Sequence, residues 1–363
     1  MNWGMLGHEW AVQLLKGQIE RDRVQHAYLI TGPQGVGRRT LAVRFAQALN
    51  CPTPLSTGEP CGTCSTCIRI EKLIHPDLII VQSEGRDKGQ DKKEDKKKNK
   101  KKGNVLIIDK IRELSHFLTL TPYEARYKVA LLLHFEEANQ NAANALLKTL
   151  EEPAPSVVLI LTADSEESLL PTIVSRCQVL RLQPLPLEAV KEDLRERCGV
   201  TPERAALLAH ISGGCPGYAF QLAGKKTNLM GDCEEDGEIS EDGISFLEER
   251  DKWLEDHQKL LSADRVQRFV YARKMATNKD VCIQMLPVWL SLWRDVLLKA
   301  TGSSVPIINV DRSAFVEKLA EKFGMEGAKN TVSAIEYTSD SLQRNANTQL
   351  AMEVLMLDLP EID

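Results

Sequence analysis

The chain has 363 residues, 43% of them hydrophobic, and a formal net charge of −5. This length and apolar content predict two or three globular domains, and the acidic balance argues against nucleic-acid binding over the whole surface. The nine cysteines do not suggest a disulfide scaffold, and the sequence has neither a signal-peptide pattern nor an 18-residue apolar run. We therefore expect a cytoplasmic protein without a membrane span.

The first predicted domain spans residues 1–182 and alternates short apolar runs with helical periodicity. Residues 1–27 predict a helical approach. The expected buried strands are Tyr28–Thr31, Leu78–Val81, Val129–Leu133, Val157–Leu161 and Val179–Leu182. Helix faces lie between them, for example at Ile111, Leu114 and Leu118. This alternation predicts an α/β fold with a parallel sheet covered on both faces.

A glycine-rich loop follows the first of these strands. Gly32–Gly37 has the glycine spacing of a P-loop, in the strand–loop–helix context that such a loop requires. A functional loop continues with Lys and then Ser or Thr, whereas this chain has Arg38 and Arg39, with Thr40 one position late. A planar guanidinium does not simply replace the compact Lys ammonium. The candidate nucleotide contacts of this degenerate P-loop are Gly32, Gly35, Gly37, Arg38 and Thr40. Whether ATP still binds there stays open, and a glycine-rich turn unrelated to phosphate binding is the alternative.

Four cysteines form the most specific motif in the chain. Cys51, Cys61, Cys64 and Cys67 lie in a polar, proline-rich loop, and two C-x₂-C steps share Cys64. Four thiolates suit tetrahedral zinc and leave no open position for catalysis. We therefore expect a structural zinc module over residues 51–67, with free surface cysteines as the alternative.

The magnesium-binding part of an ATPase site is incomplete in the sequence. An ATPase places acidic residues at the end of a buried strand, but Val129–Leu133 runs into His134 and Phe135. Glu136 and Glu137 follow, and we interpret them as carboxylates at a helix start, where the helix dipole favours them. The alternative is that they reach the nucleotide site.

Two charged segments interrupt or separate the predicted domains. The insertion at 84–103 contains Glu84–Lys102, with ten basic and five acidic residues, and we expect it to be a disordered loop; a basic arm that contacts DNA phosphates is the alternative. Residues 183–224 predict a small helical domain, and residues 225–243 an acidic linker. Residues 244–363 predict an all-helical domain. Two apolar stripes in it are assigned to the helix core, one at Trp289, Leu292, Trp293, Val296 and Leu297 and one at Leu350, Val354 and Leu357.

Several stretches together resemble the delta-prime subunits of the bacterial DNA polymerase III clamp loader, which belong to the AAA+ family. The matching stretches are His26–Leu29, the four-cysteine module, His75–Asp77, Ile108–Leu114, Asn144–Pro153 and Ser175–Cys177. The resemblance covers residues 7 to about 224 strongly and the C-terminal helices weakly. The gap between Cys51 and Cys61 is one residue longer than is usual in this family.

The resemblance implies an AAA+ module, a small helical lid and a helical collar that joins subunits into a ring. It implies that Arg176 is an arginine finger offered to the ATP site of a neighbouring subunit, and that the four cysteines bind Zn²⁺. The implied partners are the tau/gamma and delta subunits, with the sliding clamp and primed DNA reached through the complex. The chain would then belong to the DNA-directed DNA polymerase holoenzyme, a nucleotidyltransferase, without catalysis of its own.

The related ATP-hydrolysing tau/gamma subunits keep Lys-Thr in the loop, an acidic pair after the third strand and a phosphate-sensing Arg in the lid. Here all three are lost, and Tyr218 stands at the lid position. This favours a non-hydrolysing delta-prime-type subunit. Two alternatives remain: an active AAA+ ATPase of the tau/gamma type that uses Arg38 with Thr40 or Glu136, and a zinc-bearing DNA-binding protein that uses the lysine run.

Overall fold

The computed structural model describes residues 2–83, 108–224, 241–344 and 346–362, which form two compact units. Unit 1 contains the described residues up to Pro186 together with Cys215–Tyr218, and unit 2 contains Leu187–Gly214 and the described residues from Ala219 onward. The predicted insertion at 84–103 and residues 225–240 of the predicted linker lie outside the described residues. Residues 241–243 belong to a helix, so the linker was predicted too long at this end.

Unit 1 is built on a five-stranded parallel sheet with the strand order β2-β3-β4-β1-β5. The strands are β1 (Ala27–Thr31), β2 (Leu78–Val81), β3 (Lys128–Leu132), β4 (Val157–Ala163) and β5 (Gln178–Arg181). Every strand overlaps an expected one, since runs of aliphatic residues are buried on both faces of a covered parallel sheet. The expected α/β fold with a covered parallel sheet is confirmed.

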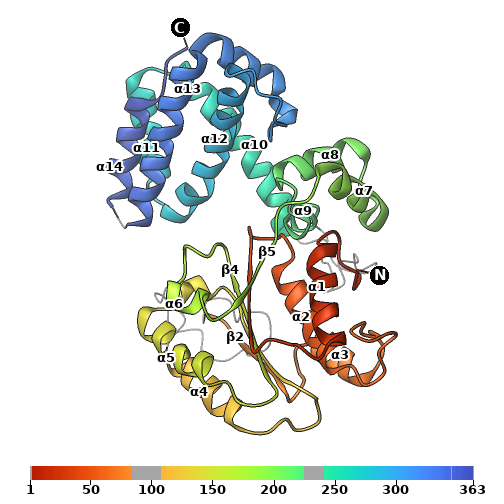
Figure 1. Cartoon of the computed structure of the whole chain (residues 1–363). Coiled ribbons are helices and arrows are strands. Elements are labelled where there is room, and N and C mark those ends of the chain that lie inside the picture. The colour runs from red at the N-terminus through yellow and green to blue at the C-terminus, as the bar shows by residue number, and fades with distance from the viewer. Residues whose placement is uncertain (1, 84–107, 225–240, 345, 363) are drawn as a thin grey trace. The chain divides into compact units, whose positions relative to one another are not determined.

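Helices cover both faces of this sheet (Figure 1). On one face are α1 (Glu9–Glu20), α2 (Arg38–Asn50) and α3 (Ser65–Glu71), and on the other are α4 (Ile108–Thr119), α5 (Gln140–Glu151) and α6 (Pro171–Val174). The predicted helix face Ile111, Leu114 and Leu118 is buried, as is Phe45 of α2. The short helix η2 (Phe135–Glu137) follows β3. The carboxyl ends of β1, β3 and β4 therefore meet at one edge of the sheet, where ligands of such folds bind.

Unit 2 begins with the helices of the small lid. These are α7 (Leu187–Cys198), α8 (Pro202–Ile211) and α9 (Pro216–Leu222), whose first turn is counted with unit 1. Leu194, Ala205, Leu208 and Leu222 are buried in these helices, whereas Leu185 just before them is half-buried. These three helices lie within the predicted span 183–224.

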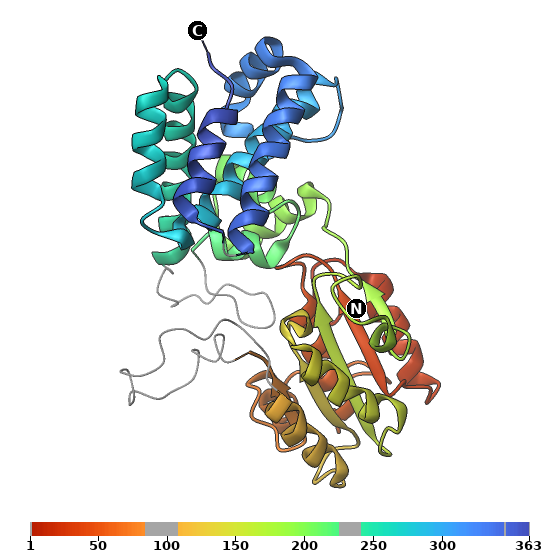
Figure 2. The same cartoon turned by 90° about the vertical axis from the view of Figure 1, so that its left-hand side faces the viewer.

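The collar is the all-helical part after the lid, and Figures 1 and 2 show its helices as a bundle. Its elements are α10 (Glu241–Leu261), α11 (Arg265–Met275), α12 (Lys279–Ala300), η3 (Val310–Arg312), α13 (Ser313–Gln343) and α14 (Thr348–Asp358). Trp289 and Trp293 of α12 are fully buried at its centre, which confirms the first predicted stripe. By length and composition α12 could cross a membrane, but half of its apolar window is buried inside unit 2, and it is the central helix of this core.

The second predicted stripe is wrong. Leu350, Val354 and Leu357 are 62%, 40% and 55% exposed, whereas Met352 and Leu355 on the opposite face of α14 are fully buried. The helix is apolar on both faces, so the periodicity of the sequence could not tell which face packs on the collar.

A buried arginine joins the ends of two collar helices. Arg268 is 2% exposed, and its guanidinium donates hydrogen bonds to the carbonyl oxygens of Leu260, Met356, Leu359 and Pro360. These carbonyls lie at or just beyond the C-terminal ends of α10 and α14, where orphan acceptors and the negative end of the helix dipole favour a cation. The N–H of Ile362 also donates to the carbonyl oxygen of Leu261.

Candidate functional site

The glycine loop connects β1 to α2 and is closely covered by backbone from the start of α9. The N–H of Gly217 donates a hydrogen bond of 2.8 Å to the carbonyl oxygen of Gly35. Gly35 has a φ of +81°, and a Cβ atom there would lie 2.6 Å from the backbone nitrogen of Tyr218. Gly35 is therefore required by this backbone contact as well as by its left-handed conformation. Tyr218, which the sequence places at the lid position of a phosphate sensor, instead packs against the loop.

The two residues that replace the P-loop Lys and hydroxyl have different environments. Arg38 is the first residue of α2 and is 5% exposed, and its Nη1 lies 2.7 Å from Oδ1 of Asp164. Arg39 is exposed, and Thr40 is half-buried in the same first turn. Asp164 directly follows β4, the parallel neighbour of β1, and this topology brings its carboxylate to the Arg38 guanidinium. The guanidinium is thus engaged with a residue of its own chain.

Acidic side chains and a histidine gather near this ion pair. Single ligand atoms of His134, Glu136 and Asp164 all lie within 4.8 Å of one another. Burial acts to raise the pKa of Glu136, but the hydrogen bond with His134 and the charge of Arg38 outweigh it, and the pKa is lowered. Glu136 is therefore an anion near the loop, in addition to its place in the short helix η2. The sequence analysis missed Asp164, although a carboxylate directly after a buried strand next to β1 is the signal that could have found it.

The four predicted zinc ligands converge in space. All four Sγ atoms lie within 4.8 Å of one another, and those of Cys51 and Cys61 are 3.6 Å apart. Zinc–sulfur bonds of ~2.3 Å place two thiolates of a tetrahedral site roughly 3.8 Å apart, so the donor set and spacing fit a metal ion of this kind. The backbone N–H of Cys64 donates to Cys61 Sγ, and that of Cys67 donates to Cys64 Sγ. These bonds are suited to thiolates, because they place positive dipoles against the sulfur atoms.

The immediate surroundings of the cysteines shift the pKa values of their thiols in different directions. The hydroxyl of Thr53 donates to Cys61 Sγ, and this bond, together with backbone N–H donors, lowers the pKa of Cys61 to about 5. Burial raises the pKa of the Cys67 thiol. The module is anchored to the rest of unit 1 by the indole of Trp3, which donates to the carbonyl oxygen of Gly58, and by Gln47, which donates to that of Cys67.

Arg176 lies between α6 and β5, outside the glycine loop. Its side chain is 35% exposed, and Nη2 donates to Oε1 of Glu151 at 2.7 Å while Nη1 donates to the carbonyl oxygen of Thr172 at 2.8 Å. Glu151 is the last residue of α5 and belongs to the stretch Asn144–Pro153 singled out in the sequence. The structure therefore holds the guanidinium at the surface in a defined orientation.

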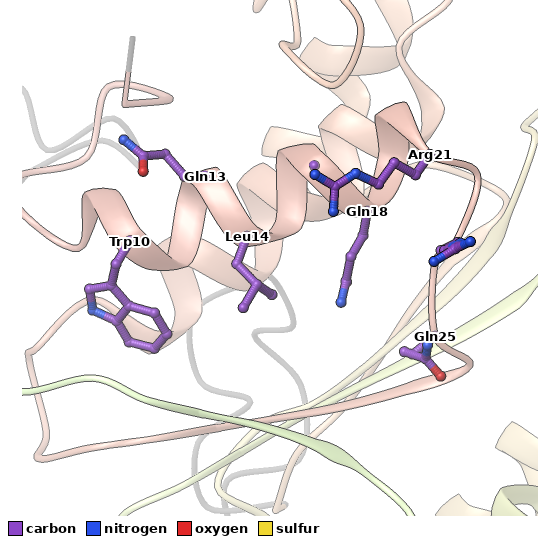
Figure 3. A pocket seen from close by; sticks show the side chains of 8 residues that line it. Trp10, Gln13, Leu14, Gln18, Arg21 and Gln25 are labelled. Carbon is purple, nitrogen blue, oxygen red and sulfur yellow. The ribbon is translucent and has the colours of Figure 1, made fainter.

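A separate surface pocket of about 560 Å³ lies beside α1 (Figure 3). The partly exposed side chains of Trp10 and Leu14 form an apolar end, and Arg21, Arg23 and Gln25 line the other. None of its lining residues belongs to the glycine loop or the cysteine module. The sequence analysis did not predict this pocket, because α1 shows only an ordinary amphipathic pattern.

Comparison with known proteins agrees with the two-part organisation. A family model described as "DNA polymerase III, delta subunit" matches residues 7–186, and one described as "DNA polymerase III, delta subunit, C terminal" matches residues 245–361. Over 360 residues the chain is 31% identical to the DNA polymerase III subunit delta' of Bacillus subtilis, covering 96% of this chain and 95% of that protein. The chain belongs to the family of DNA polymerase III delta-prime subunits. The corresponding subunit of Pseudomonas aeruginosa is 37% identical over 220 residues, which are 60% of this chain and 62% of the relative.

The tau subunits are more partial relatives of this delta-prime family member. The Escherichia coli tau subunit of DNA polymerase III is 29% identical over 248 residues, which are 67% of this chain and only 35% of that protein. The match to the Bacillus delta-prime subunit covers 96% of this chain and therefore includes both units. This extent favours the delta-prime reading of the sequence over the tau/gamma alternative.

Proposed function

We propose that this chain is a cytoplasmic, non-hydrolysing subunit of the replicative clamp loader. It assembles with tau/gamma and delta subunits in a hetero-oligomeric ring and donates Arg176 to the ATP site of a neighbouring ATPase. The ring then opens a sliding clamp and places it on primed DNA. The observation that carries the non-hydrolysing part of this proposal is the ion pair between Arg38 and Asp164 at the glycine loop.

This ion pair supports the loss of ATP hydrolysis in two ways. In an active P-loop, the Lys ammonium reaches the β- and γ-phosphates and carboxylates beyond the strands help to hold Mg²⁺. Here the guanidinium of Arg38 forms an ion pair with Asp164, so both the cation and one available carboxylate are engaged with each other. The contact of Gly217 with Gly35 adds to this, because backbone from α9 already packs on the loop.

The position of Arg176 supports a role in trans. The guanidinium is at the surface and is oriented by Glu151 and by a backbone carbonyl, so it can be presented to another subunit without refolding. A guanidinium supplied by a neighbour stabilises the charge that develops on the transferred phosphoryl group, with effects of ~10³–10⁵ in rate in related systems.

We also propose that Cys51, Cys61, Cys64 and Cys67 hold one structural Zn²⁺. Four converging sulfur donors in a loop with few apolar contacts are typical of structural zinc sites, where the metal supplies local order. The ion would close the module on itself and take no part in the chemistry of ATP.

The first test is the ATP turnover of the isolated chain. We expect no magnesium-dependent hydrolysis above background, measured as phosphate release with the Arg38→Ala variant as control. Turnover that disappears in Arg38→Ala would contradict the non-hydrolysing role. Weak nucleotide binding alone would not, since a glycine loop and a helix N-terminus can still bind phosphate.

The second test is the ATPase of the complex reconstituted with tau/gamma, delta, clamp and primed DNA. Arg176→Ala should enter the complex but lower its turnover partially, because other ATP sites take their arginine from other subunits. Arg176→Lys should rescue poorly, since a point charge does not copy the planar fork. Arg181→Ala is a matched control, because Arg181 is also exposed and paired with a glutamate. Unchanged turnover in Arg176→Ala, with incorporation verified, would reduce Arg176 to a surface cation.

A further inference from the structure

The surface arginine Arg176 forms an ion pair with a glutamate of a different helix. Glu151 is the last residue of α5, and its Oε1 accepts a hydrogen bond of 2.7 Å from Nη2 of Arg176. Nη1 of the same guanidinium donates to the carbonyl oxygen of Thr172 in α6 at 2.8 Å. Bonds from two different nitrogens fix both the position and the plane of a guanidinium, whereas a single bond would leave it free to rotate.

The two residues are carried by helices that the core holds in place. Leu150, directly before Glu151, is 2% exposed, and Ile173 of α6 is fully buried in the same hydrophobic core. The start of α5 is capped by the side chain of Asn139, which accepts a hydrogen bond from the N–H of Ala142. The two helices pack against each other on the same face of the sheet (Figure 1). The geometry of the ion pair therefore depends on the two side chains alone.

The position of Glu151 in its own helix does not favour a carboxylate. The C-terminal end of a helix is the negative end of its dipole and carries unpaired carbonyl groups, so an anion there is unfavourable. The side chain is also 51% exposed and fills no place in the core. Glu152 adds a second negative charge and makes no ion pair in the part of the chain that the structure describes. The contact with Arg176 is thus what distinguishes Glu151 from its neighbour.

The ion pair leaves part of the guanidinium available to a ligand. The Arg176 side chain is 35% exposed, and its Nε makes no hydrogen bond within the described residues. Nη2 has a second N–H besides the one that Glu151 accepts, so an anion can bind this edge while Glu151 stays bonded. Because water and salt screen an exposed ion pair, it is too weak to withhold Arg176 from a triphosphate. It is strong enough to restrict the rotamers of a long side chain.

We infer that Glu151 is a positioning residue for Arg176 in ATP hydrolysis by the neighbouring subunit. This inference rests on the proposed function and deepens it, because it names the side chain that orients the guanidinium. A free arginine side chain loses rotamer entropy when it is fixed against a phosphate, and this loss adds to the barrier of the reaction. Glu151 and the carbonyl oxygen of Thr172 fix the guanidinium before the subunits meet, so part of this loss occurs on folding instead.

The test measures ATP turnover of the complex reconstituted with tau/gamma, delta, clamp and primed DNA. Glu151→Ala should lower the part of the turnover that depends on Arg176 by about two- to fivefold, the range expected for one exposed ion pair. The loss should appear in kcat and leave the KM for ATP unchanged, because ATP is held by its own subunit. Glu151→Gln keeps the acceptor oxygen and should recover part of the loss.

Glu152→Gln is the matched control for Glu151→Gln. It removes the same charge from the next residue along the chain, and turnover should stay at the wild-type value. Thermal unfolding checks the fold of each variant. We expect the melting temperature to be unchanged or slightly raised, since removing an anion from a helix C-terminus relieves an unfavourable interaction with the dipole.

A double-mutant cycle separates positioning from a general effect on the complex. In the Arg176→Ala background, Glu151→Ala should have no further effect, because the side chain that it orients is gone. An additional loss in that background would overturn the inference, since Glu151 would then act on assembly. Unchanged or raised turnover in Glu151→Ala, while Arg176→Ala lowers it, would also overturn the inference and leave the proposed function standing. If Arg176→Ala itself leaves turnover unchanged, the proposed function fails and the inference fails with it.

Discussion

A buried histidine in the collar is held in its neutral form by its surroundings. His257 is fully buried, and the indole N–H of Trp293 donates to its Nε2 at 2.8 Å. The ring of Trp289 lies 4.5 Å away from its own. Burial, with a smaller contribution from the charge of Arg268, lowers the pKa of His257 to about 3. Protonation would place a charge in an apolar core and remove the acceptor of the Trp293 bond.

This histidine should make the collar sensitive to acid. The unfolded chain binds the proton below its ordinary pKa of about 6.5, whereas the folded chain binds it only near pH 3. The contribution of His257 to the free energy of unfolding is thus fully present above pH 6.5. Below that pH, this free energy falls by about 1.4 kcal/mol per pH unit as the pH drops toward 3. Between pH 7 and 4.5 we expect wild type to lose about 3 kcal/mol more than His257→Gln, which keeps an acceptor for Trp293 but does not titrate. Urea unfolding at both pH values measures this difference. An equal loss of unfolding free energy between pH 7 and 4.5 in the two proteins would contradict the prediction.

The proposed metal site in residues 51–67 bears on the order of this segment. Residues 51–67 contain little regular structure before α3. They are attached to the rest of unit 1 mainly by the hydrogen bond of Trp3 and by polar contacts such as that of Lys16 with Glu59. Exposed Leu55 adds nothing to a core. Metal–thiolate bonds are therefore the interaction that would give the loop a single conformation.

Removing one ligand should expose this dependence. One zinc ion per chain should copurify with wild type, and Cys64→Ser should lose it and become susceptible to protease within residues 51–67. Cys177→Ser is the control, because Cys177 lies outside the cluster and burial raises the pKa of its thiol. Metal content by mass spectrometry and limited proteolysis give the answer. Full zinc occupancy in Cys64→Ser would mean that the ligand set is wrong.

Most elements of unit 1 could be predicted from the sequence, since aliphatic runs such as Leu78–Val81 have only one stable place in a covered parallel sheet. The glycine loop and the cysteine cluster were also predictable, because their chemistry depends on local spacing. The partner of Arg38 was not, since Asp164 is distant in sequence and meets Arg38 only after β1 and β4 have paired. The outer stripe of α14 was predicted to be core, because the periodicity of a helix with two apolar sides does not show which side is buried.

At the scale of the whole molecule, the chain divides into two units with separate cores. The cysteine module lies in unit 1 and His257 lies in unit 2. A change in the cysteine module should therefore affect only the unfolding of unit 1, and a change at His257 only that of unit 2. The two effects should appear in separate transitions if the units unfold as independent cooperative blocks.

Calorimetry at pH 7 tests this independence. We expect two transitions, with Cys64→Ser lowering one and His257→Gln lowering the other, each by several degrees, since about 1 kcal/mol corresponds to roughly 2–4 °C for units of this size. Untreated wild type and a wild-type sample with chelator serve as references, and the chelator should reproduce the effect of Cys64→Ser. A single transition that both variants shift equally would show that the units unfold together.

The five-donor side chain of Arg268 has a consequence for anyone who shortens or extends this polypeptide. Two of the oxygens that bind it belong to Leu359 and Pro360, beyond the last helix. Trimming the chain before these residues would remove two acceptors from a buried cation, and would cost more than the loss of an ordinary tail. Lengthening the chain after Ile362 leaves these hydrogen bonds in place. An affinity tag fused there is therefore compatible with a stable collar, whereas a deletion of the residues after α14 is not.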